Sequence, residues 1–144
     1  MAESPSEVVV RGSVAGFAQE ITAGPHRIFS DEPKEAGGEN AGASPYELLA
    51  AALGACTSMT IGMYARHKKW PLASVNVRLR HFKSHADDCT DCESKETALD
   101  RVERDIELIG NLTEEQRAKL LEIADKCPVH RTLTRGMEIR TRLV

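Results

Sequence analysis

The chain contains four cysteines, and two of them lie where their thiols could do chemistry. Cys56 lies inside one apolar segment, and Cys127 ends another, directly before Pro128. A single cysteine on an apolar helix face most often serves as a small hydrophobic residue. Two such cysteines, on two helices that should face the same core, favour a functional role. In a reducing compartment such thiols are more often catalytic, redox-active or metal-binding than joined in structural disulfides.

A second group of candidate residues lies in the acidic segment 85–96. Cys89 and Cys92 are spaced so that both could bind one zinc ion, with His81 and His85 as weaker candidate ligands. If the preceding strand continues, these two histidines stand about 13 Å apart, too far to share an ion unless the chain bends. Three interpretations stay open: a solvated acidic loop with incidental thiols, a zinc site, and an accessory redox dithiol.

The composition predicts one soluble domain that spans residues 1–144. Of these 144 residues 41% are hydrophobic, which is enough for one core. The net charge of −3 gives no reason to expect nucleic acid or an anionic membrane as a partner. The first residues are acidic and show no basic segment followed by an apolar one, so we expect a cytoplasmic protein.

A long helix over residues 44–67 is predicted to position Cys56. Ser44 is a suitable N-cap, and Pro45 and Glu47 both favour a first helical turn. The unbroken apolar run is far shorter than the roughly 18 residues that cross a bilayer, so we expect a core helix. Residues three and four apart give the predicted buried stripe: Leu49, Ala52, Leu53, Cys56, Thr60 and Met63.

Short strands are predicted on both sides of this helix. Runs of β-forming residues over 7–11, 17–21 and 26–29, separated by glycine and proline, indicate an antiparallel meander. After the helix, alternating patterns predict two more strands, which form a hairpin around the acidic segment. Arg104 interrupts the apolar face of the second of these strands.

Another helix is predicted to position Cys127. Thr113 and Gln116 form a capping box, and the apolar stripe that follows ends with Cys127. Pro128 disfavours helical geometry in the residue before it, so Cys127 should lie at or just past the C-terminus of the helix. A final strand or hairpin is predicted over residues 133–143.

Two segments resemble the signature segments of the OsmC/Ohr family, the osmotically induced proteins and organic hydroperoxide resistance proteins. They are SPYELLAAALGACT, from Ser44 to Thr57, and the later Cys127-Pro128-Val129. The predicted order of elements resembles that family over nearly the whole chain. The resemblance implies an α+β, OsmC-like fold, with antiparallel strands around a long central helix. It also implies an intertwined homodimer with two thiol sites at its interface.

The activity that the resemblance implies is thiol-dependent reduction of organic hydroperoxides, with an external dithiol reductant and no cofactor. One thiolate attacks the peroxide and becomes a sulfenic acid, and a second thiol condenses with it to a disulfide. We expect Cys56 to be the peroxidatic thiol and Cys127 the resolving thiol. The reason is that a cysteine at a helix C-terminus faces the negative end of the helix dipole.

Family members activate the peroxidatic thiol with an arginine that a glutamate holds. We match the arginine to Arg11, with Arg27 as the alternative, and the glutamate to Glu47. In the hydroperoxide reductases the glutamate directly follows the proline, where this chain has Tyr46. In one regular helix Glu47 and Cys56 lie about 13 Å apart along the axis and on opposite faces. Glu47 can therefore act on Cys56 only through an intermediary, a helix irregularity or the partner subunit.

Two other functions fit the sequence. A non-catalytic dimer could bind an apolar ligand in its cleft, and a zinc-responsive or redox-responsive module could use Cys89 and Cys92. His130 follows the second signature segment and is expected to be either a helix-terminal cation or a general base.

Overall fold

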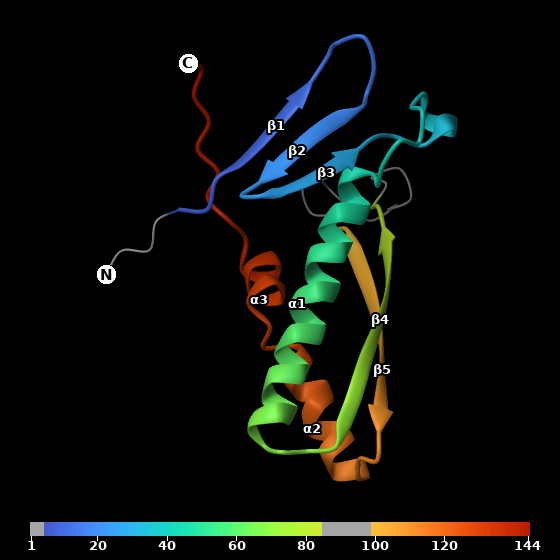
Figure 1. Ribbon diagram of the computed structural model, residues 1–144, viewed down its shortest axis with the longest axis vertical. Helices are drawn as coiled ribbons and strands as arrows, with labels where there is room; N and C mark the ends of the chain where they lie inside the picture. Colours follow the sequence, from blue (N-terminus) through green and yellow to red (C-terminus); the bar gives the residue numbers. More distant parts are fainter. Residues whose placement is uncertain (1–4, 85–98) are drawn as a thin grey trace, which may run out of the picture. The chain divides into compact units, whose positions relative to one another are not determined.

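The computed structural model describes residues 5–84 and 99–144, which form helices and antiparallel strands and confirm the α+β class (Figure 1). The chain divides into two compact units, residues 1–49 and 50–144. His85, Cys89 and Cys92 lie outside the described residues, so the zinc interpretation of that segment stays untested.

The first unit contains the predicted antiparallel meander. Its strands pair in the order β1-β2-β3, so each strand pairs with the next one along the chain. The second strand begins two residues later than the predicted 17–21. The strands and the short 3₁₀ helix that follows are β1 (Val8–Gly12), β2 (Gln19–Ala23), β3 (His26–Ser30) and η1 (Lys34–Ala36).

The loop between β3 and the long helix is organised by the buried carboxylate of Asp31. Its two oxygens accept the backbone N–H groups of Glu32, Glu39 and Ala41, at 2.8 to 3.1 Å. The hydrogen bond from Ala41 is the largest of the effects that hold the pKa of Asp31 below its ordinary value of 3.8. One ionised side chain thus holds three backbone groups of the loop together.

The long helix α1 runs from Pro45 to His67 and confirms the predicted bounds to within one residue. Ser44 Oγ accepts the backbone N–H of Glu47, as its N-cap position predicts. The predicted buried stripe is wrong in part: Cys56 and Thr60 are half-buried, and Leu49, Ala52 and Met63 are exposed. The buried residues of the helix are Leu53, Gly54, Thr57, Ile61 and Ala65.

Close packing against strand β4 decides which face of α1 is buried. A Cβ atom on Gly54 would lie 2.7 Å from Leu79 Cδ1, so a larger residue there would require the Leu79 side chain to shift. Gly54 lies on the buried face of α1, and the next turns place Thr57 and Ile61 on the same face.

By length and composition alone α1 could cross a membrane, with a mean hydropathy of 1.5 over an 18-residue window. One such helix is weak evidence, because core helices of soluble proteins pass the same test. Ile61 and Ala65 of α1 belong to the hydrophobic core of the second unit, as expected of a core helix.

The hairpin of β4 (Leu72–Phe82) and β5 (Arg101–Gly110) is antiparallel, as predicted, and runs beside α1 in Figure 1. Alternate residues of each strand are partly buried, which is the pattern of a sheet with one inner face. Arg104 has the same parity as Ile106 and Leu108 and lies on that inner face. It pairs with Leu79 of β4 in the register.

Helix α2 (Glu114–Ala124) completes the core of the second unit. The predicted capping box is confirmed, because Thr113 Oγ1 accepts the Gln116 N–H while the Gln116 side chain accepts the Thr113 N–H. The buried core residues are Ile61, Ala65, Leu112, Leu120 and Ala124.

A further helix, α3, runs from Pro128 to Arg135 and was not predicted. Pro128 occupies its first turn, where the fixed φ of proline suits a helix and its missing N–H costs nothing. The strand predicted over 133–143 is therefore wrong: α3 covers its first residues, and residues 136–144 form no regular element. Gly136, with a φ of 90°, ends the helix.

Candidate functional site

Cys127 is a fully buried free thiol at the N-cap of α3. Its backbone is extended, with φ −64° and ψ 140°, and its Sγ accepts the backbone N–H of His130 at 3.3 Å. The prediction that it faces the negative end of a helix dipole is wrong. Helix α2 ends at Ala124, and the sulfur lies instead at the positive end of α3, where free N–H groups favour negative charge.

The side chain that joins Cys127 to helix α1 is Thr57. Thr57 Oγ1 is 3.9 Å from Cys127 Sγ, and either atom could donate in this contact. The same hydroxyl donates to the carbonyl oxygen of Leu53 at 2.7 Å. The buried thiol of Cys127 therefore lies against the turn of α1 that carries Thr57, the residue directly after Cys56.

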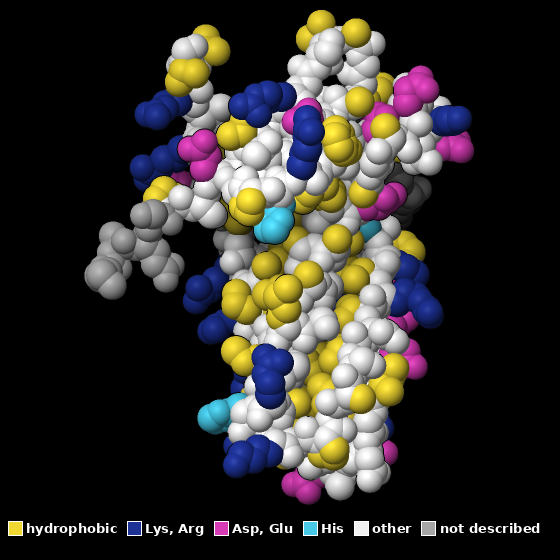
Figure 2. Space-filling view, viewed as in Figure 1, with side chains coloured by type: hydrophobic (Ala, Val, Ile, Leu, Met, Phe, Trp, Pro, Cys, Tyr) yellow, Lys and Arg dark blue, Asp and Glu magenta, His cyan; other side chains and the backbone are white. Residues whose placement is uncertain are grey.

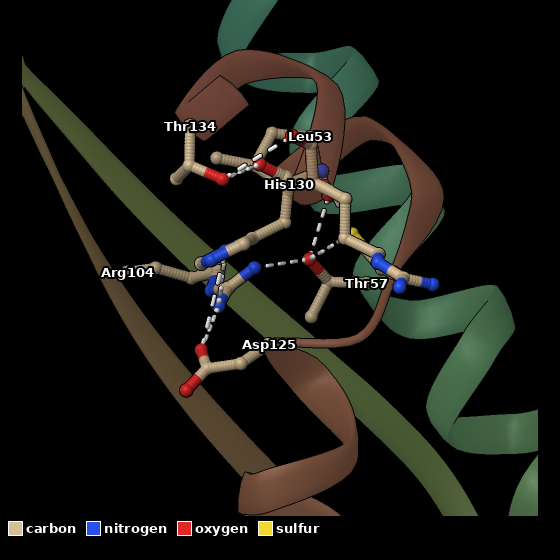
Figure 3. A network of polar contacts seen from close by, with 8 residues as sticks. Leu53, Thr57, Arg104, Asp125, His130 and Thr134 are labelled. Carbon is tan, nitrogen blue, oxygen red and sulfur yellow. Dashed lines mark hydrogen bonds and ion pairs between the residues drawn. The ribbon is translucent and has the colours of Figure 1, made fainter.

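Arg104 reaches this site from β5 and contacts three other elements. Its Nη1 donates to Thr57 Oγ1 at 2.9 Å, and its Nη2 donates to Asp125 Oδ1 at 3.0 Å. Its Nη2 also lies 3.3 Å from His130 Nδ1. Only 11% of the Arg104 side chain is exposed. Figure 3 shows this network, in which one guanidinium group ties α1 to the end of α2 and to α3.

The contact with Arg104 decides how His130 can act. A guanidinium group only donates, so His130 Nδ1 accepts, which places the ring hydrogen on Nε2. The competing ion pair between His130 Nδ1 and Asp125 Oδ1 is longer, at 4.0 Å. In this arrangement Arg104 occupies His130 Nδ1, and the roles of helix-terminal cation and general base stay predictions.

Cys56 is half-buried on α1 and is also a free thiol. Consecutive helical residues point about 100° apart, so Cys56 lies at the edge of the face that carries Thr57 rather than on it. The Cys56–Cys127 disulfide stays a prediction, since both sulfurs are reduced here.

The residues proposed to activate Cys56 belong to the first unit. Arg11 is exposed on β1, where it pairs with Glu20 of β2 in the register. Arg27, the alternative arginine, is 2.8 Å from Glu20 Oε1 and is also exposed. Glu47 is exposed in the first turn of α1. The activation of Cys56 by Arg11 and Glu47 stays a prediction.

His81, proposed as a weak zinc ligand, lies close to Asp100. His81 Nε2 is 2.8 Å from Asp100 Oδ2, and the Ser84 N–H donates to Asp100 Oδ1. The Ser84 hydrogen bond, followed by that with His81, holds the pKa of Asp100 below its ordinary value. Among residues 5–84 and 99–144, no three His, Cys, Asp or Glu side chains are grouped so that they could hold a metal ion.

Both thiols are identifiable from the sequence, but the sequence suggests no role for Arg104. The signal was present, since a charged residue on the apolar parity of a strand must find buried partners. What the sequence did not contain was the identity of those partners, which lie 21 to 47 residues from Arg104 in the chain.

Comparison of the sequence with known families finds a match to the family described as OsmC-like protein, over residues 37–142. No curated protein matches the chain.

Solved structures share the fold. An OsmC-like protein from Mycoplasma pneumoniae has a TM-score of 0.74 at 16% identity, over 92% of this chain and 89% of that one. An organic hydroperoxide resistance protein OsmC from Legionella pneumophila has a TM-score of 0.67 at 22% identity, over 92% and 91%. An organic hydroperoxide resistance protein from Elizabethkingia anophelis has a TM-score of 0.68 at 21% identity, over 94% and 91%.

Proposed function

The chain belongs to the OsmC-like family, and we propose that it is a thiol-dependent peroxidase that reduces organic hydroperoxides through Cys56 and Cys127. Neighbours in fold carry the name of organic hydroperoxide resistance proteins, which supports the substrate class. The observation that carries the proposal is the contact between Cys127 Sγ and Thr57, the residue directly after Cys56. This contact supports the proposed pairing of Cys127 with Cys56.

The reaction requires two thiols and an external dithiol. The Cys56 thiolate attacks one oxygen of the peroxide, the O–O bond breaks, and the alkoxide takes a proton to leave as an alcohol. Cys56 is then a sulfenic acid. The Cys127 thiolate attacks its sulfur, hydroxide leaves and is protonated to water, and a disulfide remains. An external dithiol returns the disulfide to two thiols by exchange, and is itself oxidised to a disulfide.

The burial of the two thiols supports this order of events. Cys56 is half-buried, whereas Cys127 has no exposed surface. A peroxide from solution therefore meets Cys56 first, and Cys127 is reached only from inside the protein. This reason replaces the helix-dipole argument, which the N-cap position of Cys127 contradicts.

We further propose that the protein is a homodimer and that a second copy covers α1. Large apolar side chains are exposed on this helix, among them Met59 at 73% and Met63 at 61%. Figure 2 shows apolar side chains gathered along α1 and between it and β4. Burying this surface would remove water from around Cys56. In the dimer, Arg11 and Glu47 are proposed to activate Cys56.

The test is consumption of an organic hydroperoxide by the purified protein with a dithiol reductant in excess. The proposal expects many turnovers per protein and a faster rate with an organic hydroperoxide than with hydrogen peroxide. A monothiol reductant is the matched control, because a single thiol is a poorer partner for a protein disulfide. No consumption above the rate of the reductant alone would overturn the proposal.

A further inference from the structure

The hydrogen-bond capacity of Thr57 restricts how it meets Cys127. A hydroxyl group has one hydrogen to donate and two lone pairs. The hydrogen goes to Leu53 O at 2.7 Å, and one lone pair accepts Arg104 Nη1 at 2.9 Å. One lone pair remains for the contact with Cys127 Sγ. While Cys127 is a thiol, its S–H donates to Thr57 and its sulfur accepts the His130 N–H.

Once Cys127 has lost its thiol proton, only one other hydrogen needs to move, that of the Thr57 hydroxyl group. The sulfur then has no hydrogen, and the Thr57 hydroxyl can turn its own hydrogen from Leu53 O to Sγ. The Leu53 carbonyl is not left unsatisfied, because in the helix it also accepts the backbone N–H of Thr57. The bond from Arg104 to Thr57 Oγ1 is compatible with both states.

Arg104 favours the thiolate state of Cys127, in which the Thr57 hydroxyl group donates to the sulfur. A hydroxyl group that accepts a hydrogen bond from a cation becomes a stronger donor, because hydrogen bonds in a chain polarise one another. The site is buried, so water screens this effect little. The guanidinium group itself is held by Asp125 and by His130 Nδ1, which leave Nη1 directed at Thr57.

We propose that Arg104 is a positioning residue that stabilises the thiolate of Cys127 through the hydroxyl group of Thr57. The catalytic role of Arg104 rests on the proposed peroxidase function and concerns its resolving step. The resolving step needs Cys127 as a thiolate: it attacks the sulfur of the Cys56 sulfenic acid, forms the disulfide and releases hydroxide, which is protonated to water. Because Arg104 and Thr57 lower the free energy of forming this thiolate, they would speed disulfide formation at neutral pH.

The charged and titratable groups around Cys127 come from several elements. β5 supplies Arg104, the segment after α2 supplies Asp125, and α3 supplies His130. Lys126, the residue before Cys127, pairs with Glu122 at 3.6 Å. Helix α1 faces the sulfur with the uncharged Thr57. Asp125 opposes a thiolate, but it is bound to Arg104 and its side chain is 69% exposed, so solvent screens it.

The experiment measures the ionisation of Cys127 by the ultraviolet absorbance of its thiolate as the pH is raised. Cys56, Cys89 and Cys92 are replaced by serine, which leaves Cys127 as the only cysteine. In this background we expect Arg104→Gln to move the midpoint of the thiolate absorbance to higher pH. Thr57→Val, which keeps the cation but removes the hydroxyl, should also move the midpoint upward. Thr57→Ser, which keeps the hydroxyl group, should have the same midpoint as the parent protein.

Arg101→Gln is the matched control, because it removes the same charge from an exposed position of the same strand. It should leave the midpoint unchanged. Arg104→Lys, which retains a cation, should lie between the parent and Arg104→Gln and serves as the test if the glutamine variant does not fold. Circular dichroism reports folding separately. A purely structural role would change the unfolding temperature but not the midpoint.

Unchanged midpoints in folded Arg104→Lys or Arg104→Gln and in Thr57→Val would overturn the inference. No peroxide takes part in this titration, so its result is independent of turnover. A shifted midpoint in a protein that consumes no peroxide would keep the inference and reject the proposed function. Unchanged midpoints in a protein that consumes peroxide would reject the inference and keep the proposed function.

Discussion

Thr57 Oγ1 lies 3.9 Å from Cys127 Sγ, so the fully buried thiol at the start of α3 rests against the α1 residue that follows Cys56. The contact joins two segments separated by 70 residues in the chain. It shows which turn of α1 meets Cys127, and the separate positions of these residues in the sequence do not contain that information.

Replacing Cys56 by serine should abolish peroxide turnover and leave the fold intact. Serine is close to cysteine in size, but its hydroxyl cannot pass through a sulfenic acid. Peroxide consumption with a dithiol reductant measures the effect, and circular dichroism checks the fold. Full activity in this variant would reject the enzymatic function.

Replacing Cys127 by serine should allow one oxidation and then stop the cycle. Without a resolving thiol, the Cys56 sulfenic acid persists and a second peroxide converts it to sulfinic acid. Mass spectrometry of the intact protein should show added oxygen atoms that increase with peroxide. The wild type under the same conditions should show a loss of two hydrogens instead, and a variant without added oxygen would contradict these roles.

Replacing both Cys89 and Cys92 by serine should leave peroxide turnover unchanged. The sequence places these residues in an acidic polar segment rather than on an apolar face. The same peroxide assay decides the point, and metal analysis of the purified wild type tests the zinc interpretation. A loss of turnover as large as that of Cys56→Ser would move the active site to this segment.

Replacing Ala52 by arginine should cause aggregation or unfolding. Ala52 is exposed in the single chain, on the same helix as the exposed Met59 and Met63. In a symmetric dimer that buries this face, one substitution places two unpaired charges in the interface, each costing several kcal/mol.

Leu121→Arg, at an exposed position of α2, is the matched control and should stay folded and dimeric. Sedimentation of the wild type at micromolar concentration is the direct measurement. A well-folded wild-type monomer would contradict the dimer, and with it any site that needs two subunits.

Replacing Asp31 by asparagine should destabilise the protein at neutral pH and have little effect in acid. The folded pKa of Asp31 is lowered, so its ionised form contributes stability above its ordinary value of 3.8. This contribution is lost as the pH falls through the folded pKa. Asparagine cannot accept all three N–H groups, because one of its side-chain groups is itself a donor.

Thermal unfolding of wild type and Asp31→Asn from pH 7 downward measures this difference. Glu35→Gln, at an exposed position of the same loop, is the control and should show a smaller effect at every pH. An Asp31→Asn effect that stays constant down to pH 2 would contradict the role of the charge.

The elements that depend on neighbours in the chain were predictable from the sequence. The N-cap at Ser44, the capping box of Thr113 with Gln116, and the alternation that forms the β4–β5 hairpin all rest on interactions within a few residues or on a simple period. The family resemblance predicted the fold class, and the match over residues 37–142 confirms the family.

Only the tertiary structure decided which face of α1 is buried and what surrounds Cys127. An apolar helix such as α1 has several faces that could be buried, and the close approach of Leu79 to Gly54 selects one. Pro128 is compatible both with the end of one helix and with the start of the next, and the structure shows that it starts α3. The partners of Arg104 lie on α1, after α2 and on α3, and no local pattern can specify contacts made when these elements pack together.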